Sequence, residues 1–243
     1  MTYCVGLLVD TGLVLLSDSR TNAGVDQIST FRKMAVFQRP DERVLVLLSA
    51  GNLAITQAAV NILHQGGAGD EAGVPPIHRA ANMFEAARVV GDALREVHQR
   101  DAAFLKDQGH EFNGTFILGG QIKGEEPRLF HVYSAGNFVE SSIDTPYFQM
   151  GESKYGKPII DRVIRRSSSL AQAAKCALVS MDSTIRSNLS VGPPLDLAIV
   201  RRDEYRLATH ISIDLENEYF HMIRTRWGQA LQEVFSELPN PNW

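Results

Sequence analysis

The chain has few cysteines and no excess of positive charge. Only Cys4 and Cys176 occur among 243 residues, they lie far apart, and neither belongs to a Cys-x-x-Cys pattern, which argues against a disulfide framework. Lysine and arginine number 24 against 28 aspartates and glutamates, so the net charge is −4. Such a chain lacks the basic field that attracts nucleic acids and anionic lipids. We therefore expect a cytoplasmic protein that binds no nucleic acid.

Long apolar runs are also missing. No stretch approaches the ~20 apolar residues needed to cross a bilayer, and the segment Met1–Gly6 lacks the basic region of a secretory signal. The histidines show no metal-ligand spacing, and the glycine-rich stretch 66–73 matches neither a P-loop nor a dinucleotide-binding pattern. The sequence therefore predicts no membrane segment, no metal and no cofactor.

What the sequence does contain is a regular series of strands and helices. With 44% apolar and 21% charged residues, its composition fits one globular domain over residues 1–243. Short continuous apolar runs predict strands, and apolar residues at helical spacing predict helices. The predicted strands are 3–9, 13–17, 34–37, 44–49, 115–119, 129–134, 147–150, 195–200 and 205–213. The predicted helices are 53–64, 83–97, 155–164, 170–185 and a last one from 215 onward.

The order of these elements predicts the fold class. Strands and helices come in groups rather than in the strict alternation of a doubly wound parallel sheet. The strands lack an apolar-polar alternation, so they are expected to be covered on both faces. A four-layer αββα sandwich of the α+β class, with two antiparallel sheets between helices, satisfies both observations. The glycine- and proline-rich connection 66–76 is predicted to be flexible but is too short for a domain linker.

Thr2 follows the initiator methionine, and this position gives the first hypothesis about function. Cells remove an initiator methionine when a small residue follows it, which would leave Thr2 with a hydroxyl and a free α-amine. An α-amine titrates near pH ~8 and can act as a base at neutral pH. A threonine activated by its own amine is a recognised nucleophile. We therefore predict an amidase-type hydrolase, a prediction that depends on the residues around Thr2 because many inert chains also begin Met-Thr.

Three further residues fit a site built around Thr2. Asp18 ends an apolar strand, where a buried carboxylate needs a partner. Lys33 lies where a later strand begins, and an Asp18–Lys33 pair would keep a cation close to the Thr2 hydroxyl. Gly51 follows a strand and precedes a helix, so its N–H can point at a developing oxyanion. Each residue alone has an ordinary structural explanation, but together with Thr2 they predict catalysis.

At these four residues the sequence resembles a known family. They resemble the threonine, aspartate, lysine and glycine of the proteasome β-subunit type of N-terminal nucleophile (Ntn) hydrolases. The closer similarity is to the bacterial proteasome-related group called Anbu, and it covers essentially the whole chain. The segments that are most similar to that group are Thr2–Gly6, Ser17–Asp26, Asp182–Thr184 and Arg186–Gly192.

The resemblance implies the αββα Ntn-hydrolase fold, which the order of elements also predicts. It further implies hydrolysis of peptide bonds in peptide or protein substrates, without a cofactor. It implies a homo-oligomer, either a ring or an open spiral, in which Thr2 faces an enclosed space. Met1 alone precedes Thr2, which fits a family member without a propeptide.

The sequence departs from the proteasome pattern in the residues that assist the threonine amine. That pattern has a later aspartate followed three residues on by Ser-Gly, and Asp182 is not followed by such a pair. Asp182, Ser187 and Ser190 are the candidates for these roles, and their spacing does not choose among them. Ser153 resembles a serine that a family loop places near the threonine, and a helix N-cap is an equally good explanation for it.

Five residues are predicted to line the pocket for the substrate side chain that precedes the cut. Phe31 and Ala35 share one strand face with Lys33 because side chains alternate along a strand. The predicted pocket residues are Thr21, Phe31, Ala35, Ser49 and Leu53. This set predicts a preference for small or apolar side chains.

Two other functions remain open. The same fold can hydrolyse a small amide or catalyse acyl transfer, because a fold does not fix a substrate. The chain can instead form a non-proteolytic ring or spiral scaffold, which the missing Asp-x-x-Ser-Gly pattern favours. A cysteine nucleophile fits less well, since Cys4 does not directly follow Met1 and is better explained as a small buried hydrophobe.

Overall fold

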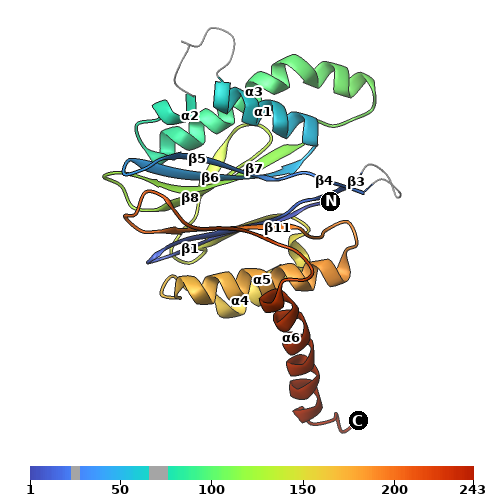
Figure 1. Ribbon diagram of the computed structural model, residues 1–243. Coiled ribbons are helices and arrows are strands. Elements are labelled where there is room, and N and C mark those ends of the chain that lie inside the picture. Colours follow the sequence, from blue (N-terminus) through green and yellow to red (C-terminus); the bar gives the residue numbers. More distant parts are fainter. Residues whose placement is uncertain (23–27, 66–75) are drawn as a thin grey trace.

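The computed structural model describes residues 1–22, 28–65 and 76–243, and its two large antiparallel sheets lie face to face (Figure 1). The first sheet has the strand order β10 (Tyr147–Gly151), β1 (Tyr3–Val9), β2 (Gly12–Asp18), β11 (Leu195–Arg201), β12 (Leu207–Ile213). The second sheet has the order β5 (Met34–Arg39), β6 (Arg43–Gly51), β7 (Gly114–Ile122), β8 (Arg128–Val132), β9 (Phe138–Glu140). A small hairpin pairs β3 (Arg20–Asn22) with β4 (Ile28–Thr30).

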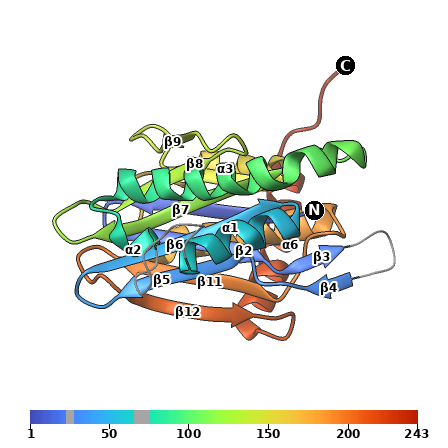
Figure 2. The ribbon, with the colours of Figure 1, turned by 90° about the horizontal axis from the view of Figure 1, so that it is seen from above.

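Helices cover the outer face of each large sheet. The helices on the second sheet are α1 (Leu53–Gln65), α2 (Pro76–Arg79) and α3 (Met83–Asp107) (Figures 1 and 2). Those on the first sheet are α4 (Ser153–Val163) and α5 (Leu170–Ser187), and α6 (Glu218–Glu237) projects beyond them (Figure 1). Within the described ranges, no helix has the length and apolar character to cross a membrane. The arrangement confirms the predicted α+β class and the four-layer αββα sandwich.

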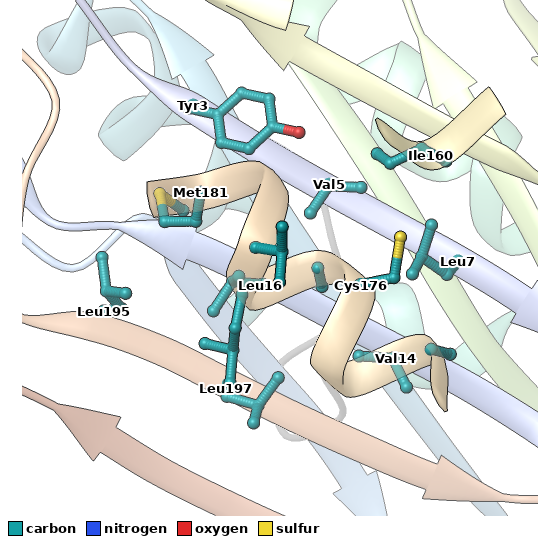
Figure 3. Packing of buried hydrophobic residues seen from close by; sticks show 14 of the residues in the cluster. Tyr3, Val5, Leu7, Val14, Leu16, Ile160, Cys176, Met181, Leu195 and Leu197 are labelled. Carbon is teal, nitrogen blue, oxygen red and sulfur yellow. The ribbon is translucent and has the colours of Figure 1, made fainter. Parts of the chain in front are cut away.

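Three apolar clusters fill the spaces between the layers. The cluster between the first sheet and its helices contains Tyr3, Leu16 and Met181 (Figure 3). A second cluster, which includes Phe37, lies between the second sheet and α1–α3. The third lies between the sheets and includes Leu15. Because β1 and β2 are buried along their whole length, their sequences are continuous apolar runs, as predicted.

Strand register brings several strand ends to one end of the sandwich. In the first sheet Tyr3 lies opposite Gly151, and antiparallel pairing puts the beginning of β1 beside the end of β2. In the second sheet Gly51 lies opposite Gly114, so the end of β6 meets the beginning of β7. Thr2, directly before β1, therefore lies at the end of the sandwich where β2 ends at Asp18 and β6 ends at Gly51.

The elements that the sequence did not predict are short. Strands β3, β4 and β9 contain three residues each and α2 contains four, too few for a periodic pattern. The predicted helix 83–97 continues to Asp107, because good helix formers extend it without apolar spacing. The predicted strand 129–134 ends at Val132. The connection predicted at 66–76 falls almost entirely outside the described residues.

Candidate active site

The centre of the candidate site is a buried ion pair between Asp18 and Lys33. Lys33 Nζ lies 2.7 Å from Asp18 Oδ1, and the two side chains are 6% and 0% exposed. The ammonium also donates to the carbonyl of Arg20 at 2.7 Å. The backbone N–H groups of Tyr3 and Gly192 donate to Asp18 at 3.0 and 3.4 Å. Burial raises the pKa of the Asp18 carboxyl, while Lys33 and these N–H groups oppose that rise.

The loop that follows α5 packs against the residues after Asp18. Arg20 Nη1 donates to the carbonyl of Leu189 at 2.8 Å, and the Arg20 N–H donates to the carbonyl of Gly192 at 3.3 Å. Ser19 Oγ donates to the carbonyl of Pro194 at 2.6 Å. These bonds fix the loop against the end of β2, so that the Gly192 N–H reaches the carboxylate.

The backbone of Thr2 is fixed by the end of β10. The Thr2 carbonyl accepts a hydrogen bond from the N–H of Glu152 at 2.8 Å. Gly151 has a φ of 76°, and a Cβ there would lie 1.8 Å from the Thr2 carbonyl oxygen. Only glycine therefore permits this close approach. Met1 is exposed and lines the same cleft as Thr2, so its removal would uncover the Thr2 amine at the cleft.

Tyr3 anchors the chain directly after Thr2. Its hydroxyl donates to Ser180 Oγ at 3.0 Å and accepts from Gln149 Nε2 at 2.5 Å. Figure 3 shows its ring among the side chains of the cluster between the first sheet and its helices. Burial raises the pKa of Tyr3 above its usual range, so the hydroxyl stays protonated and remains a donor. Thr2 is thus held by β10 on one side and by a fixed neighbour on the other.

A cleft of about 960 Å³ opens beside Thr2. Its walls include Lys33 and Gly51 and four of the five predicted pocket residues: Thr21, Phe31, Ser49 and Leu53. The fifth, Ala35, lines a second groove along α1 that shares Lys33, Ser49, Leu53 and Thr56 with the cleft. Asp18 does not line the cleft itself. Its carboxylate binds the ammonium of Lys33, which does line the cleft. The structure therefore brings together the four residues predicted to support catalysis.

Gly51, the last residue of β6, lies at a position that excludes any larger residue. Its φ is 106°, and a Cβ there would lie 2.4 Å from the carbonyl oxygen of Asn113. The N–H of Asn52 donates to the same carbonyl at 2.7 Å. All three residues line the cleft. The backbone at the end of β6 is therefore part of the cleft wall.

Two predicted catalytic residues, Ser153 and Asp182, are not among the residues that line the cleft. Ser153 is the first residue of α4, and the N-cap is Glu152, so Ser153 is neither a cleft residue nor the N-cap. Asp182 is buried in α5, where its Oδ1 accepts from Arg224 Nε of α6 at 2.9 Å. The Asp182 carboxylate thus joins α5 to α6 through Arg224, 42 residues away in the sequence, and it also lies 3.5 Å from Arg186 Nε of its own helix.

The other candidates for supporting the Thr2 amine are also absent from the cleft walls. Ser187 is the last residue of α5, and Ser190 donates its backbone N–H to Asn188 Oδ1 in the following loop. In the part of the chain that the structure describes, no carboxylate lines the cleft. The described cleft walls therefore offer the Thr2 amine hydroxyl, amide and imidazole side chains but no carboxylate.

Sequence reasoning missed several cleft residues, namely Ser29, Asn52, Thr56, His110, Asn113 and Thr115. Asn113 and Thr115 flank the start of β7, which pairs with the end of β6. Both strands were predicted, but their pairing was not, and the pairing is the signal that would have placed these residues beside Gly51. His110 follows α3, where no local pattern points to a site.

Comparison with known proteins identifies the family. No family model matches the chain. The structure of Anbu (ancestral beta-subunit) from Yersinia bercovieri is 51% identical in sequence, and the match covers 99% of both chains with a TM-score of 0.90. This chain belongs to the Anbu family. The predicted resemblance to Anbu is therefore confirmed.

Other relatives agree with this assignment to Anbu. The Gly-1 mutant of Anbu from Hyphomicrobium sp. strain MC1 is 47% identical over 100% of both chains, with a TM-score of 0.91. Anbu from Pseudomonas aeruginosa, solved as a helical assembly, is 44% identical over 99% of this chain and 98% of that chain, with a TM-score of 0.91. Proteasome subunit beta 2 of Nitrosopumilus maritimus (strain SCM1) is 25% identical over 214 residues, 86% of this chain and 90% of that protein. The Anbu fold here is thus the proteasome β-subunit fold, as predicted.

Proposed function

We propose that this Anbu protein is a cytoplasmic threonine peptidase that hydrolyses peptide bonds with Thr2 after Met1 has been removed. The observation that carries the proposal is the buried Asp18–Lys33 ion pair at the wall of the cleft that Thr2 lines. Burying two charges costs free energy that an apolar pair would not cost. Lys33 and Thr2 line the same cleft. A cation near a hydroxyl favours deprotonation of that hydroxyl, which gives the buried pair a role in catalysis.

In the proposed reaction, Thr2 Oγ attacks the carbonyl carbon of the substrate. The free α-amine of Thr2, directly or through a water molecule, accepts the hydroxyl proton. Lys33, held by Asp18, supplies positive potential, and the N–H of Gly51 stabilises the oxyanion. The proton then passes to the leaving nitrogen, the C–N bond breaks and an ester forms on Thr2. Water hydrolyses the ester, releases the acid and restores the hydroxyl.

The pocket for the side chain before the cut is proposed to consist of Thr21, Phe31, Ala35, Ser49 and Leu53. Four of these line the cleft, and Ala35 lines the groove that continues from it along α1. Ala35 and Leu53 offer apolar contacts, and Phe31 is partly exposed at the wall. We therefore expect small or apolar side chains to be preferred in this pocket.

Substitution of the nucleophile tests the reaction. With Met1 removed, Thr2→Ala is expected to lower hydrolysis of a peptide library by at least about a thousandfold, because it removes the attacking oxygen. Intact-mass spectrometry first confirms that Met1 is absent, and a threonine-reactive electrophile then measures covalent labelling. Thr209→Ala, in β12 and outside the cleft, serves as the control. Hydrolysis that persists in Thr2→Ala would contradict the mechanism.

We also propose that the protein assembles into a homo-oligomeric ring or open spiral, and α6 supports this. The helix has 20 residues and is buried only near its start, at Phe220 and Ile223. Its later turns project from the body (Figure 1) and expose the apolar residues Leu231, Val234 and Phe235, and the C-cap residue Leu238 is exposed beside them. An apolar stripe of this kind marks a protein interface. The helical assembly of the P. aeruginosa relative is consistent with a second copy as the partner.

Charge on this stripe should prevent assembly. The double substitution Val234→Asp and Phe235→Asp is expected to weaken subunit association by ~10²-fold or more, because two apolar anchors become charged. Size-exclusion chromatography with light scattering measures the mass of the particle. The control is Gln232→Glu, which adds charge at a position that is already polar. An unchanged particle mass in the double variant would show that α6 is not an interface.

The alternative function is a peptide-binding scaffold without hydrolysis. It is favoured by the absence of any carboxylate from the described cleft walls, where the proteasome pattern places support for the amine. In that case the processed protein would bind peptides but remain unlabelled by the electrophile. Labelling of Thr2 in the processed assembly would exclude this alternative, while hydrolysis of small acyl-amides in place of peptides would indicate an amidase.

A further inference from the structure

Asp196 is a second buried carboxylate near the active-site ion pair, and the proposed reaction does not use it. It lies in β11, is 3% exposed and stands opposite Ser17 of β2. Asp18 stands opposite Leu195, one residue away in the same register. Because successive side chains of a strand point to opposite faces, the two carboxylates leave the first sheet on opposite sides.

Each carboxylate meets one of two consecutive cations. Asp18 Oδ1 lies 2.7 Å from Lys33 Nζ, and Asp196 Oδ1 lies 3.7 Å from Arg32 Nη1. Arg32 and Lys33 are neighbours in the segment between β4 and β5. The first sheet therefore holds this segment of the chain at two points, through two adjacent strands.

The ion pairs of Arg32 and Lys33 help to hold the segment 31–33 in place. Residues 31–33 belong to no strand. The backbone N–H of Phe31 donates to the carbonyl of Ser19 at 2.9 Å, and the carbonyl of Lys33 accepts from the N–H of Ser49 at 2.8 Å. Arg32 lies between these two bonds. Its link to Asp196 thus restrains the middle of the segment that presents Lys33 to the cleft.

Asp196 is an unfavourable residue on stability grounds alone. Its Oδ2 and the opposing Ser17 Oγ are buried without a hydrogen-bond partner. The Arg32 side chain is 67% exposed, so solvent weakens its attraction to the carboxylate. Burying an incompletely paired carboxylate costs free energy, and an apolar residue would avoid that cost. An unsatisfied group next to an active site therefore calls for another explanation.

We propose that Asp196 is a positioning residue that, through Arg32, fixes the segment 31–33 and thereby the approach of Lys33 to Thr2. This role rests on the proposed function, since Lys33 matters only if Thr2 is activated. Asp196 touches neither the nucleophile nor the cleft. It acts by holding Arg32, as Asp18 acts by holding Lys33.

Protonation of Asp196 is expected to change how the activity depends on pH. Burial raises the pKa of the Asp196 carboxyl, and Arg32 and His210 of β12 oppose that rise. Beyond Ser17 in the same cross-strand row lies Cys4, whose thiol stays protonated because burial raises its pKa above the usual range. As pH falls, Asp196 is therefore protonated earlier than an ordinary carboxyl and releases Arg32. At low pH, protonation of Asp18 and protonation of Asp196 should each lower activity. In Asp196→Asn, only the protonation of Asp18 should contribute to this loss.

The first test measures the reactivity of the Lys33 amine and needs no catalysis. Competitive labelling with acetic anhydride, read by mass spectrometry, is carried out in the Thr2→Ala protein. Asp196→Asn and Arg32→Gln should each raise Lys33 labelling about fivefold, as expected for loss of a partly exposed ion pair. The double variant should show no further rise, because both changes break one link. Glu204→Gln, which removes an exposed pair with Arg201 at the end of β11, should have no effect.

The second test uses the processed, catalytic protein. Asp196→Asn should lower kcat about fivefold with little change in KM, since Lys33 orientation affects the reacting oxygen and not substrate binding. Asp196→Glu should restore most of the rate. Unchanged Lys33 labelling in both Asp196→Asn and Arg32→Gln would overturn the proposal. If Asp196→Asn fails to fold, Arg32→Gln still tests the link, because Arg32 is exposed and its substitution should not disturb the core. Altered labelling in a protein that never hydrolyses peptides would contradict the peptidase and leave only the restraint of the segment 31–33 by Asp196.

Discussion

Replacing Lys33 with alanine is expected to destabilise the fold and abolish labelling of Thr2. The change leaves the Asp18 carboxylate fully buried without its cation, with only the N–H groups of Tyr3 and Gly192 as donors. Breaking a buried ion pair by removing one partner costs roughly 3–5 kcal/mol. Urea denaturation measures the free energy of unfolding, and the threonine-reactive electrophile measures the nucleophile in the same samples.

Two controls separate stability from chemistry in this experiment. Arg201→Ala removes an exposed pair with Glu204 and should change neither quantity. The double variant Asp18→Asn, Lys33→Met removes both charges, so it should recover much of the lost stability while remaining unlabelled. A double variant that is stable and still labelled would show that the ion pair serves the fold and not the hydroxyl.

The parts of the site that could be predicted from the sequence are those fixed by strand ends. Asp18 ends an apolar strand and Lys33 precedes another, and both residues are buried as an ion pair in the structure. A charged residue at the end of a continuous apolar run is informative because its burial requires a partner. The same reasoning predicted the layers, since strands buried on both faces need a sheet on one side and helices on the other.

The contacts that the sequence could not predict involve residues whose partners are distant in sequence. Asp182 was matched to a role near Thr2, but α6 supplies Arg224 to its carboxylate, and nothing local to either residue indicates that helix contact. Asp196 received no role, because its position opposite Ser17 depends on the pairing of β2 with β11. Propensity and spacing describe single elements, whereas these contacts arise from how the elements pack.

The position of Thr2 depends on a glycine, and Gly151→Ala is expected to displace the nucleophile. An added Cβ would lie 1.8 Å from the Thr2 carbonyl oxygen and 3.3 Å from the Thr2 Cβ. Because the closest atom belongs to the backbone, β10 and the start of β1 must move apart. Misplacement of a reacting group by about 1 Å can lower its rate by ~10²-fold. We expect a loss of that size in the rate of Thr2 labelling, together with a loss of at least about 2 kcal/mol in the free energy of unfolding.

Gly109→Ala is the matched control for this substitution. Gly109 has a φ of 74°, close to the 76° of Gly151, but a Cβ there meets no atom within 4 Å. It therefore isolates the cost of a left-handed backbone, about 1 kcal/mol, from the cost of the steric clash. The difference between the two variants measures how tightly β10 holds Thr2. Equal losses of stability, with labelling retained in both, would mean that the close approach of Gly151 does not position the nucleophile.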